Sequence, residues 1–336
     1  MRRRSYKFFI TVMLRNFLNL LFFTSLLFTG CSNREETQDS SRSGENNFLC
    51  QETSDETSGI ASNEISESTD KSKIINDTLA LNYESVVSEL ENHLSDDFII
   101  KPYLYYVVVS NLSEDETGQL MENTITKATD CFYNDYFRKK PDELTTIFLF
   151  KDEKSYRYWA NKLYADTDLS IYGYYKPDYR AMLMNINTGS GTLVHEMTHA
   201  LVRFDFPDIP SWFNEGLGSL YERCSLNDGM IKGYVNWRLP SLQEALADGS
   251  YTGLDVMLRT DYDEFYGDNS GFYYSQARYL CMFLQEKGLL RAFYKAFRDN
   301  YSEDVTGRTI LERVYGKDLT ALESEYITWV GTLEYE

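Results

Sequence analysis

The chain has 336 residues and a net charge of −19, with only three histidines and five cysteines. Proteins that bind nucleic acid carry basic patches, so this acidic balance argues against DNA or RNA as a partner. The same balance leaves no basic surface for anionic lipids, so an attachment to a membrane would need a separate anchor.

The first 30 residues have the composition of a secretory signal. Four basic residues near the start precede a mostly apolar run, Phe8 to Phe28. The stretch Leu27 to Cys31 then resembles the lipobox of bacterial lipoproteins, although Phe28 stands where Leu is usual. This resemblance implies cleavage before Cys31, lipidation (palmitate) of that cysteine, and a protein anchored to a bacterial membrane, in the cell envelope outside the cytoplasm. The alternative is an uncleaved membrane helix, for which the run is long enough.

Residues 32–78 hold 11 acidic and 4 basic residues, with abundant Ser, Thr and Asn and no apolar periodicity. Such a segment buries too little apolar surface to offset the entropy of ordering it. We therefore expect a disordered linker over 31–78, which holds the folded part away from the membrane. The folded part is then 79–336, which is long enough for one large domain.

Helical and strand patterns alternate in the first half of the folded part. Thr145 to Phe150 is typical of a strand, and Ser113 with Glu116 forms a capping box at the start of a helix. The expected elements are helices at Leu81–Leu94, Ser113–Phe137 and Glu153–Tyr164, strands at Tyr103–Val109 and Thr145–Phe150, and a hairpin of Gly173–Tyr175 with Arg180–Ile186. This order predicts a small mixed sheet.

An H-E-x-x-H motif follows that sheet, with His195, Glu196 and His199. Two histidines four residues apart lie on one face of a helix, so both imidazoles can reach one ion. Glu196 projects beside such an ion, which suits a base acting on a metal-bound water. The remaining positions of the helix are apolar, so unpaired polar groups there would be costly.

Glu215 lies 16 residues after His199, beyond a break at Pro207 to Pro210. The break predicts a second helix with Ser211 as its N-cap, and it returns Glu215 towards the first helix. Gly216 and Gly218 lack side chains that would hold the two helices apart. Two imidazoles and one carboxylate are the ligand set of a catalytic zinc site. The alternative is that the two histidines form hydrogen bonds with neighbouring backbone groups and bind no metal, while Glu215 is exposed to solvent.

These residues and the segment Pro-Ser-Trp-Phe-Asn-Glu-Gly-Leu-Gly resemble the gluzincin metallopeptidases, in particular bacterial peptidase MA-like domains, over about residues 170–290. The resemblance implies one Zn²⁺ per chain, held by His195, His199 and Glu215, with Glu196 as general base. It implies a zincin-like α+β fold: a small mixed β-sheet lobe with helices and the active-site helix (79–204), then a mainly α-helical lobe (205–336). It also implies that an edge strand, for which Arg180–Ile186 is our candidate, binds the peptide substrate.

The C-terminal part is expected to be helical. The predicted helices are Ser241–Ala247, Leu254–Leu258, Gly271–Lys287, Leu289–Arg298, Thr309–Val314 and Thr320–Leu333. Within the third of these, the segment around Tyr274 resembles a family segment near the zinc. A phenol there would donate a hydrogen bond to the oxyanion, and we assign this role to Tyr274. Tyr273 is the second candidate for the role, and Gln276 is a candidate neighbour. The alternative is that these tyrosines only pack the helix.

Two further expectations concern the surroundings of the site. Ser219 and Glu222 are the nearest candidates to orient the imidazoles, and Cys224 and Cys281 flank elements that approach the site, so they are candidates for a disulfide.

The sequence therefore predicts a membrane-anchored zinc metallopeptidase that acts on a peptide or protein substrate. One alternative is a non-catalytic surface lipoprotein that binds a peptide or a cell-wall ligand on the same scaffold. A third is a structural envelope protein with an accidental motif. The intact Glu196 favours the enzyme, because a binding protein needs the ligands but no base.

Overall fold

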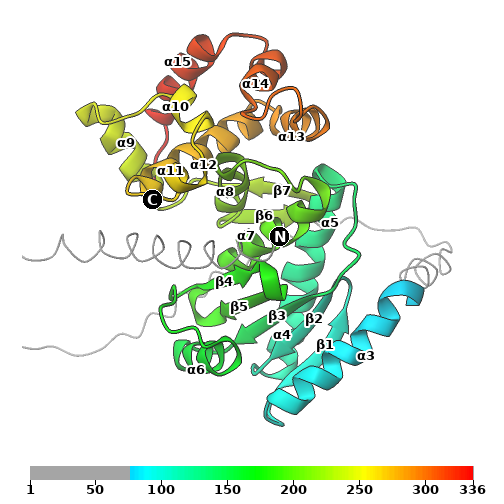
Figure 1. Ribbon diagram of the computed structural model, residues 1–336. Coiled ribbons are helices and arrows are strands. Elements are labelled where there is room, and N and C mark those ends of the chain that lie inside the picture. Colours follow the sequence, from blue (N-terminus) through cyan, green and yellow to red (C-terminus); the bar gives the residue numbers. More distant parts are fainter. Residues whose placement is uncertain (1–75, 336) are drawn as a thin grey trace, which may run out of the picture.

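The computed structural model describes residues 76–335. The expected signal segment, Cys31 and nearly all of the linker lie outside these residues. Figure 1 shows a sheet with its helices, a central helix pair, and a group of helices formed by the C-terminal part of the chain. Within residues 76–335, no helix is long and apolar enough to cross a membrane.

A five-stranded mixed sheet forms the first half of the described chain. Its strands are β1 (Ile99–Tyr103), β2 (Tyr106–Ser110), β3 (Thr145–Phe150), β4 (Gly173–Lys176) and β5 (Ala181–Asn185). The spatial order is β1-β2-β3-β5-β4, with β2, β3 and β5 parallel and the two outer strands antiparallel to their neighbours. The predicted combination of a mixed sheet with helices is confirmed.

The prediction of a single strand over Tyr103–Val109 was wrong. The chain makes a tight turn at Leu104, whose φ of 52° lies in the left-handed region, and Tyr103 pairs with Tyr106 across a hairpin. The apolar run continues through this turn without a Gly or Asn. The usual local signal for a two-residue hairpin is therefore absent.

The edge strand was also assigned wrongly. β5 lies between β3 and β4, so Arg180–Ile186 cannot accept a further strand, and β4 is the edge strand beside it. The burial explains this order, because every residue of β5 is buried, as is typical of an interior strand. In β4, by contrast, only Gly173 is buried.

Helices cover the sheet. They are α3 (Asn76–His93), α6 (Glu153–Tyr164), and the run α4 (Glu114–Leu120), η1 (Met121–Thr126) and α5 (Lys127–Asp135). This run is the helix predicted from Ser113, and both bonds of its capping box with Glu116 are present. The middle piece, η1, is a π-helix, which the sequence pattern does not reveal.

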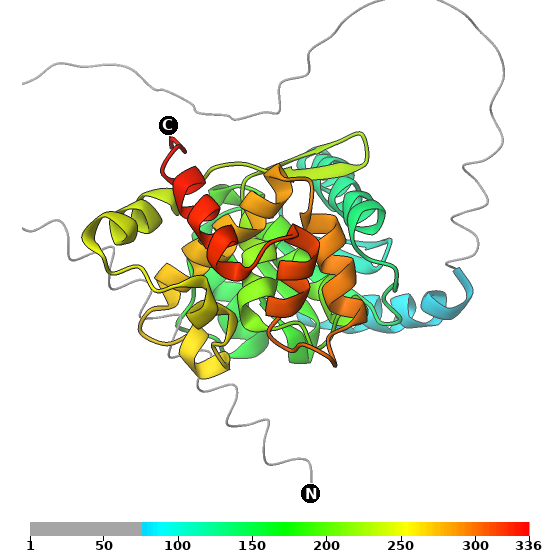
Figure 2. The ribbon, with the colours of Figure 1, turned by 90° about the horizontal axis from the view of Figure 1, so that it is seen from above.

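The second half of the described chain is mostly helical, as predicted. It contains α7 (Gly191–Asp205), α8 (Ser211–Leu220), α9 (Leu239–Asp248), α10 (Leu254–Leu258), α11 (Tyr262–Phe265), α12 (Ser270–Glu286), α13 (Leu290–Asp299), α14 (Arg308–Tyr315) and α15 (Leu319–Val330). Viewed from above, the C-terminal helices lie across the central helices (Figure 2). A hairpin of β6 (Cys224–Asn227) and β7 (Met230–Gly233) was missed, although its turn carries Asp228-Gly229, a hairpin signal, with φ of 52° and 68°.

The suggested disulfide between Cys224 and Cys281 does not form, because Cys131, Cys224 and Cys281 make no disulfide bond with one another. Cys281 is buried in the contact between α12 and α8 and faces Gly216. Its sulfur therefore fills space in this helix contact.

Candidate metal centre

The two histidines of the H-E-x-x-H motif lie on α7, which packs between the sheet and the second half of the chain (Figure 1). The helix forms because its other side chains are apolar and buried, among them Leu193, Val194 and Met197. The side chains of His195 and His199 are only 10% and 14% exposed. Two polar rings are thus held side by side in a largely apolar helix, where they need partners.

Glu215 reaches the same place from α8. The predicted break at Pro207–Pro210 is present, but Pro210 is the N-cap and Ser211 is the first helical residue. Pro210 has the extended backbone (φ −68°, ψ 152°) that an N-cap needs, and its carbonyl accepts from the amides of Phe213 and Asn214. The cap thus lies one residue before the predicted one.

The three predicted ligands converge. Oε2 of Glu215 lies 3.4 Å from Nε2 of His195 and 3.4 Å from Nε2 of His199. The two Nε2 atoms are 2.9 Å apart, and one ligand atom from each of the three residues lies within 4.8 Å of the others. Oε2 of Glu215 is buried without a hydrogen-bond partner. Two imidazole nitrogens and an unpartnered carboxylate oxygen fit a zinc ion, which prefers this donor set.

The two glycines of α8 face different neighbours. A Cβ on Gly218 would lie 3.1 Å from Cε1 of His199 and 3.2 Å from Nε2 of His195, so Gly218 allows α8 to approach the imidazoles. A Cβ on Gly216 would lie 2.8 Å from the carbonyl oxygen of Ala277 on α12. Gly218 acts as expected, whereas Gly216 permits the contact with α12 instead.

Polar side chains contact the outer nitrogens of both imidazoles. Nδ1 of His199 is 3.0 Å from Oδ1 of Asn214, and Nδ1 of His195 is 3.4 Å from Oε1 of Glu222. Glu222 therefore lies near His195, as expected, but at an ion-pair distance, because Nδ1 of His195 makes no hydrogen bond in the described structure. The hydroxyl of buried Ser219 also has no hydrogen-bond partner. Asn214 was missed, although its position directly before Glu215 places it on the same turn of α8.

Two tyrosines from the second half of the chain lie near Glu215. The hydroxyl of Tyr266, on the residue after α11, donates to Oε1 of Glu215 at 2.5 Å, and this residue was missed. Tyr274 on α12 is buried, and its pKa is raised well above 10 by burial and by the Glu215 carboxylate. The amide of Gln276 donates to the carbonyl of Thr252 at 2.7 Å. Tyr273 instead stacks on Phe265.

The buried charges of the site shift one another's pKa values. Burial opposes protonation of His195, but Glu215 and Glu222 outweigh it and raise the pKa to about 10. Burial would also raise the pKa of Glu215, yet His199 and His195 outweigh it and hold this pKa well below 4.5. Burial raises the pKa of Glu196, and the two imidazoles, which lower this pKa, do not outweigh the effect of burial. A carboxylate with a raised pKa beside a ligand cluster suits a general base.

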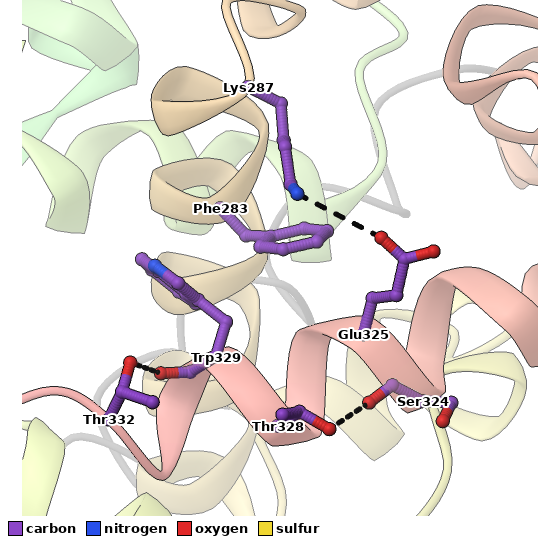
Figure 3. A pocket seen from close by; sticks show the side chains of 7 residues that line it. All are labelled: Phe283, Lys287, Ser324, Glu325, Thr328, Trp329 and Thr332. Carbon is purple, nitrogen blue, oxygen red and sulfur yellow. Dashed lines mark hydrogen bonds and ion pairs between the residues drawn. The ribbon is translucent and has the colours of Figure 1, made fainter.

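A separate, open pocket lies between α12 and α15 (Figure 3). It is lined by Phe283, Trp329 and an ion pair in which Nζ of Lys287 lies 3.8 Å from Oε2 of Glu325. Phe283 lies in the C-terminal half of α12 and Lys287 directly follows that helix, whereas Tyr274 lies near the start of α12. Glu325 and Trp329 lie on α15. The pocket therefore does not include the ligand cluster.

No protein-family model matches this chain, and no curated protein matches it.

Proposed function

We propose that this protein is a zinc-dependent peptidase of gluzincin type with a zincin-like fold. The observation that carries the proposal is the convergence of Nε2 of His195, Nε2 of His199 and the unpartnered Oε2 of Glu215. In this proposal the three residues hold one Zn²⁺, and the ion supplies Lewis-acid chemistry that lowers the pKa of water and polarises a carbonyl.

The residues of the chain then have distinct roles. Glu196 takes the proton of the attacking water on its carboxylate and passes it to the leaving amine. Asn214 and Glu222 hold Nδ1 of the two imidazoles, so that each Nε2 faces the cluster. Tyr274 donates a hydrogen bond to the oxyanion of the substrate.

We propose further that the substrate is a peptide that lies along β4 (Gly173–Lys176), the edge strand beside α7. Its outer edge carries backbone groups that pair with no strand of the described sheet. An extended peptide could add there as a further strand, next to the helix that carries Glu196. β4 takes the role that was first given to Arg180–Ile186.

The rest of the proposal concerns residues outside the described part. The signal-like run and Cys31 support a lipoprotein anchored to a bacterial membrane, with its catalytic part outside the cytoplasm. Labelling of the protein with radioactive palmitate in bacterial cells tests this anchoring. The label should be incorporated by the natural chain and lost in Cys31→Ser.

The experiment for the catalytic proposal compares the purified full chain with Glu196→Gln. Zinc per chain is counted in both proteins, and both are incubated with a mixed peptide library. We expect about one zinc in each, and cleavage only by the natural chain, since loss of a general base costs roughly 10²–10⁴ in rate. Zinc without cleavage in either protein would favour the alternative, a surface lipoprotein that binds a peptide or cell-wall ligand. Absence of zinc from both would refute the proposal.

A further inference from the structure

A loop that follows β7, from Tyr234 to Arg238, approaches the metal centre from the side of α12. The guanidinium of Arg278 donates to the carbonyl of Tyr234. The hydroxyl of Tyr279 contacts both the amide and the carbonyl of Asn236, each at 3.1 Å. Because both anchoring residues are buried on α12, this helix fixes the position of the loop.

Two side chains of this loop converge on Glu222. Nη2 of Arg238 lies 2.7 Å from Oε1, Nε lies 3.0 Å from Oε2, and Nδ2 of Asn236 lies 3.0 Å from Oε2. The bidentate geometry fixes the plane of the carboxylate as well as its position. Oε1, held in this way, is the atom that lies 3.4 Å from Nδ1 of His195.

The guanidinium of Arg238 also lies over two aromatic rings. Its central carbon lies 4.1 Å from the ring centre of Trp237 and 5.1 Å from that of Tyr274. Contacts of a guanidinium with aromatic faces are attractive, and more so where water is excluded. The side chain of Arg238 is only 7% exposed, so its orientation is determined by these contacts and by Glu222.

We infer that Arg238, together with Asn236, is a positioning residue of the metal centre and acts through Glu222. The loop holds the carboxylate of Glu222 against Nδ1 of His195, which keeps a proton on Nδ1 and turns Nε2 towards His199 and Glu215. No part of Arg238 needs to touch the metal or the substrate. The inference rests on the metal site of the proposed function.

A bidentate arginine is needed at this position. Without Arg238, the buried carboxylate of Glu222 would lose its charge partner, and a buried unpaired charge is strongly unfavourable. It would then no longer be fixed in position or in plane, and Oε1 would no longer be held at Nδ1 of His195. A lysine would restore the charge but not the two parallel hydrogen bonds.

The test measures zinc affinity by competition with a chromophoric chelator, in the full chain and in Arg238→Met, Glu222→Gln and the double variant. We expect Arg238→Met to weaken zinc binding by about 10–100-fold, the usual effect of losing an outer partner of a ligand. In the Glu222→Gln background, the same change should have less than about threefold effect, because its route to His195 is already lost.

Arg298→Met is a matched control. The side chain of Arg298 is also 7% exposed, and it makes a buried ion pair of 2.6 Å with Asp205 at the far end of α7, without contact to a ligand. This variant should lower the melting temperature but leave zinc affinity within about twofold. Equal losses of zinc affinity in Arg298→Met and Arg238→Met would overturn the inference.

A spectroscopic readout separates positioning from general destabilisation. The chain has three histidines, so the ring nitrogens of the zinc-loaded protein are resolvable by NMR. The NMR signal of the Nδ1 proton of His195 should be observed in the natural chain and lost or shifted in Arg238→Lys. This variant keeps the positive charge, so it can be measured even if Arg238→Met does not fold. If Arg238→Lys left both the Nδ1 signal and the zinc affinity unchanged, the inference about Arg238 would be overturned, whereas the proposed metal site would still stand. Absence of zinc binding by the natural chain would instead refute the metal site itself.

Discussion

The hydroxyl of Tyr266 donates a hydrogen bond to Oε1 of Glu215 at 2.5 Å, which leaves Oε2 to face the two imidazoles at 3.4 Å. The two oxygens of one carboxylate thus have different partners. Oε1 is held by a residue that follows α11, and Oε2 remains for the proposed metal. Tyr266 is therefore expected to fix the orientation of the ligand, whereas Tyr274 is proposed to act on the substrate.

Replacing each tyrosine by phenylalanine should separate these two roles. Tyr266→Phe should weaken zinc binding by about 10-fold, because the carboxylate of Glu215 loses the donor that orients it. Tyr274→Phe should leave zinc affinity unchanged and lower kcat by about 10²–10³, the effect of losing an oxyanion donor. Chelator competition measures the first effect, and assays at saturating zinc measure the second. If Tyr274→Phe were fully active, the tyrosine would only pack α12.

The ligand cluster was predictable because its residues are close in sequence or belong to one recognisable segment. The spacing of His195 and His199 follows from the period of a helix, and the helix break at Pro207–Pro210 determines the return of Glu215. Tyr266, by contrast, lies 51 residues from its partner, in a segment with no signal that relates it to a metal. Such a contact depends on how α11 and α8 pack, and no local pattern encodes it.

The same distinction holds for the sheet. Strand β3 was recognised from its β-branched and aromatic residues, and β5 as one arm of a hairpin. Their lateral order was not predicted, because the order depends on how the whole chain packs. The continuous apolar run Ala181–Met184 in β5 was in fact the signal for an interior strand. The resemblance, which implied an edge strand directly before the active-site helix, outweighed this signal.

The two glycines of α8 give a matched pair of variants. In Gly218→Ala, the new Cβ lies 3.1–3.2 Å from atoms of His199 and His195, so the imidazoles must shift by a few tenths of an ångström. We expect weaker zinc binding, by less than about tenfold, with little loss of stability, because Ala favours a helix over Gly.

In Gly216→Ala, the Cβ would lie 2.8 Å from the backbone oxygen of Ala277 and 3.0 Å from the sulfur of Cys281. We expect this overpacking to lower the free energy of unfolding by about 1–3 kcal/mol, with zinc affinity nearly unchanged. Thermal unfolding and chelator competition on both variants check the pair. If both variants changed zinc affinity and unfolding free energy in the same way, the assignment of Gly218 to the imidazoles and of Gly216 to α12 would be contradicted.

The pH dependence of stability should reverse when zinc is bound. In the metal-free protein, the pKa of His195 is raised from 6.5 in the unfolded chain to about 10 in the folded chain. Between these two pH values the folded state therefore holds a proton that the unfolded state releases. The contribution of His195 to stability is complete below about pH 6.5 and is lost as the pH rises towards 10. Zinc instead requires neutral imidazoles, so at fixed free zinc its affinity should rise with pH over this range. Denaturant unfolding with and without zinc measures both slopes. A metal-free protein that becomes more stable from pH 7 to 10 would contradict the ion pairs of His195.

The free edge of β4 leads to a prediction about the substrate. β4 is joined to α7 by a hydrogen bond of 2.9 Å from Arg203 to the hydroxyl of Tyr175, so a peptide paired with β4 would lie along the helix that carries Glu196. In an added strand, successive backbone amides point alternately towards and away from the neighbouring strand. N-methylation of a cleaved peptide, one position at a time, should therefore lower kcat/KM by about tenfold or more at alternate positions and have little effect between them. A partner on β4 that the bound peptide covers and leaves without its hydrogen bond costs about 1–3 kcal/mol. The matched control is the same set of peptides with side-chain methylation at the same positions. Equal tolerance of N-methylation at every position would mean that the substrate does not pair with β4.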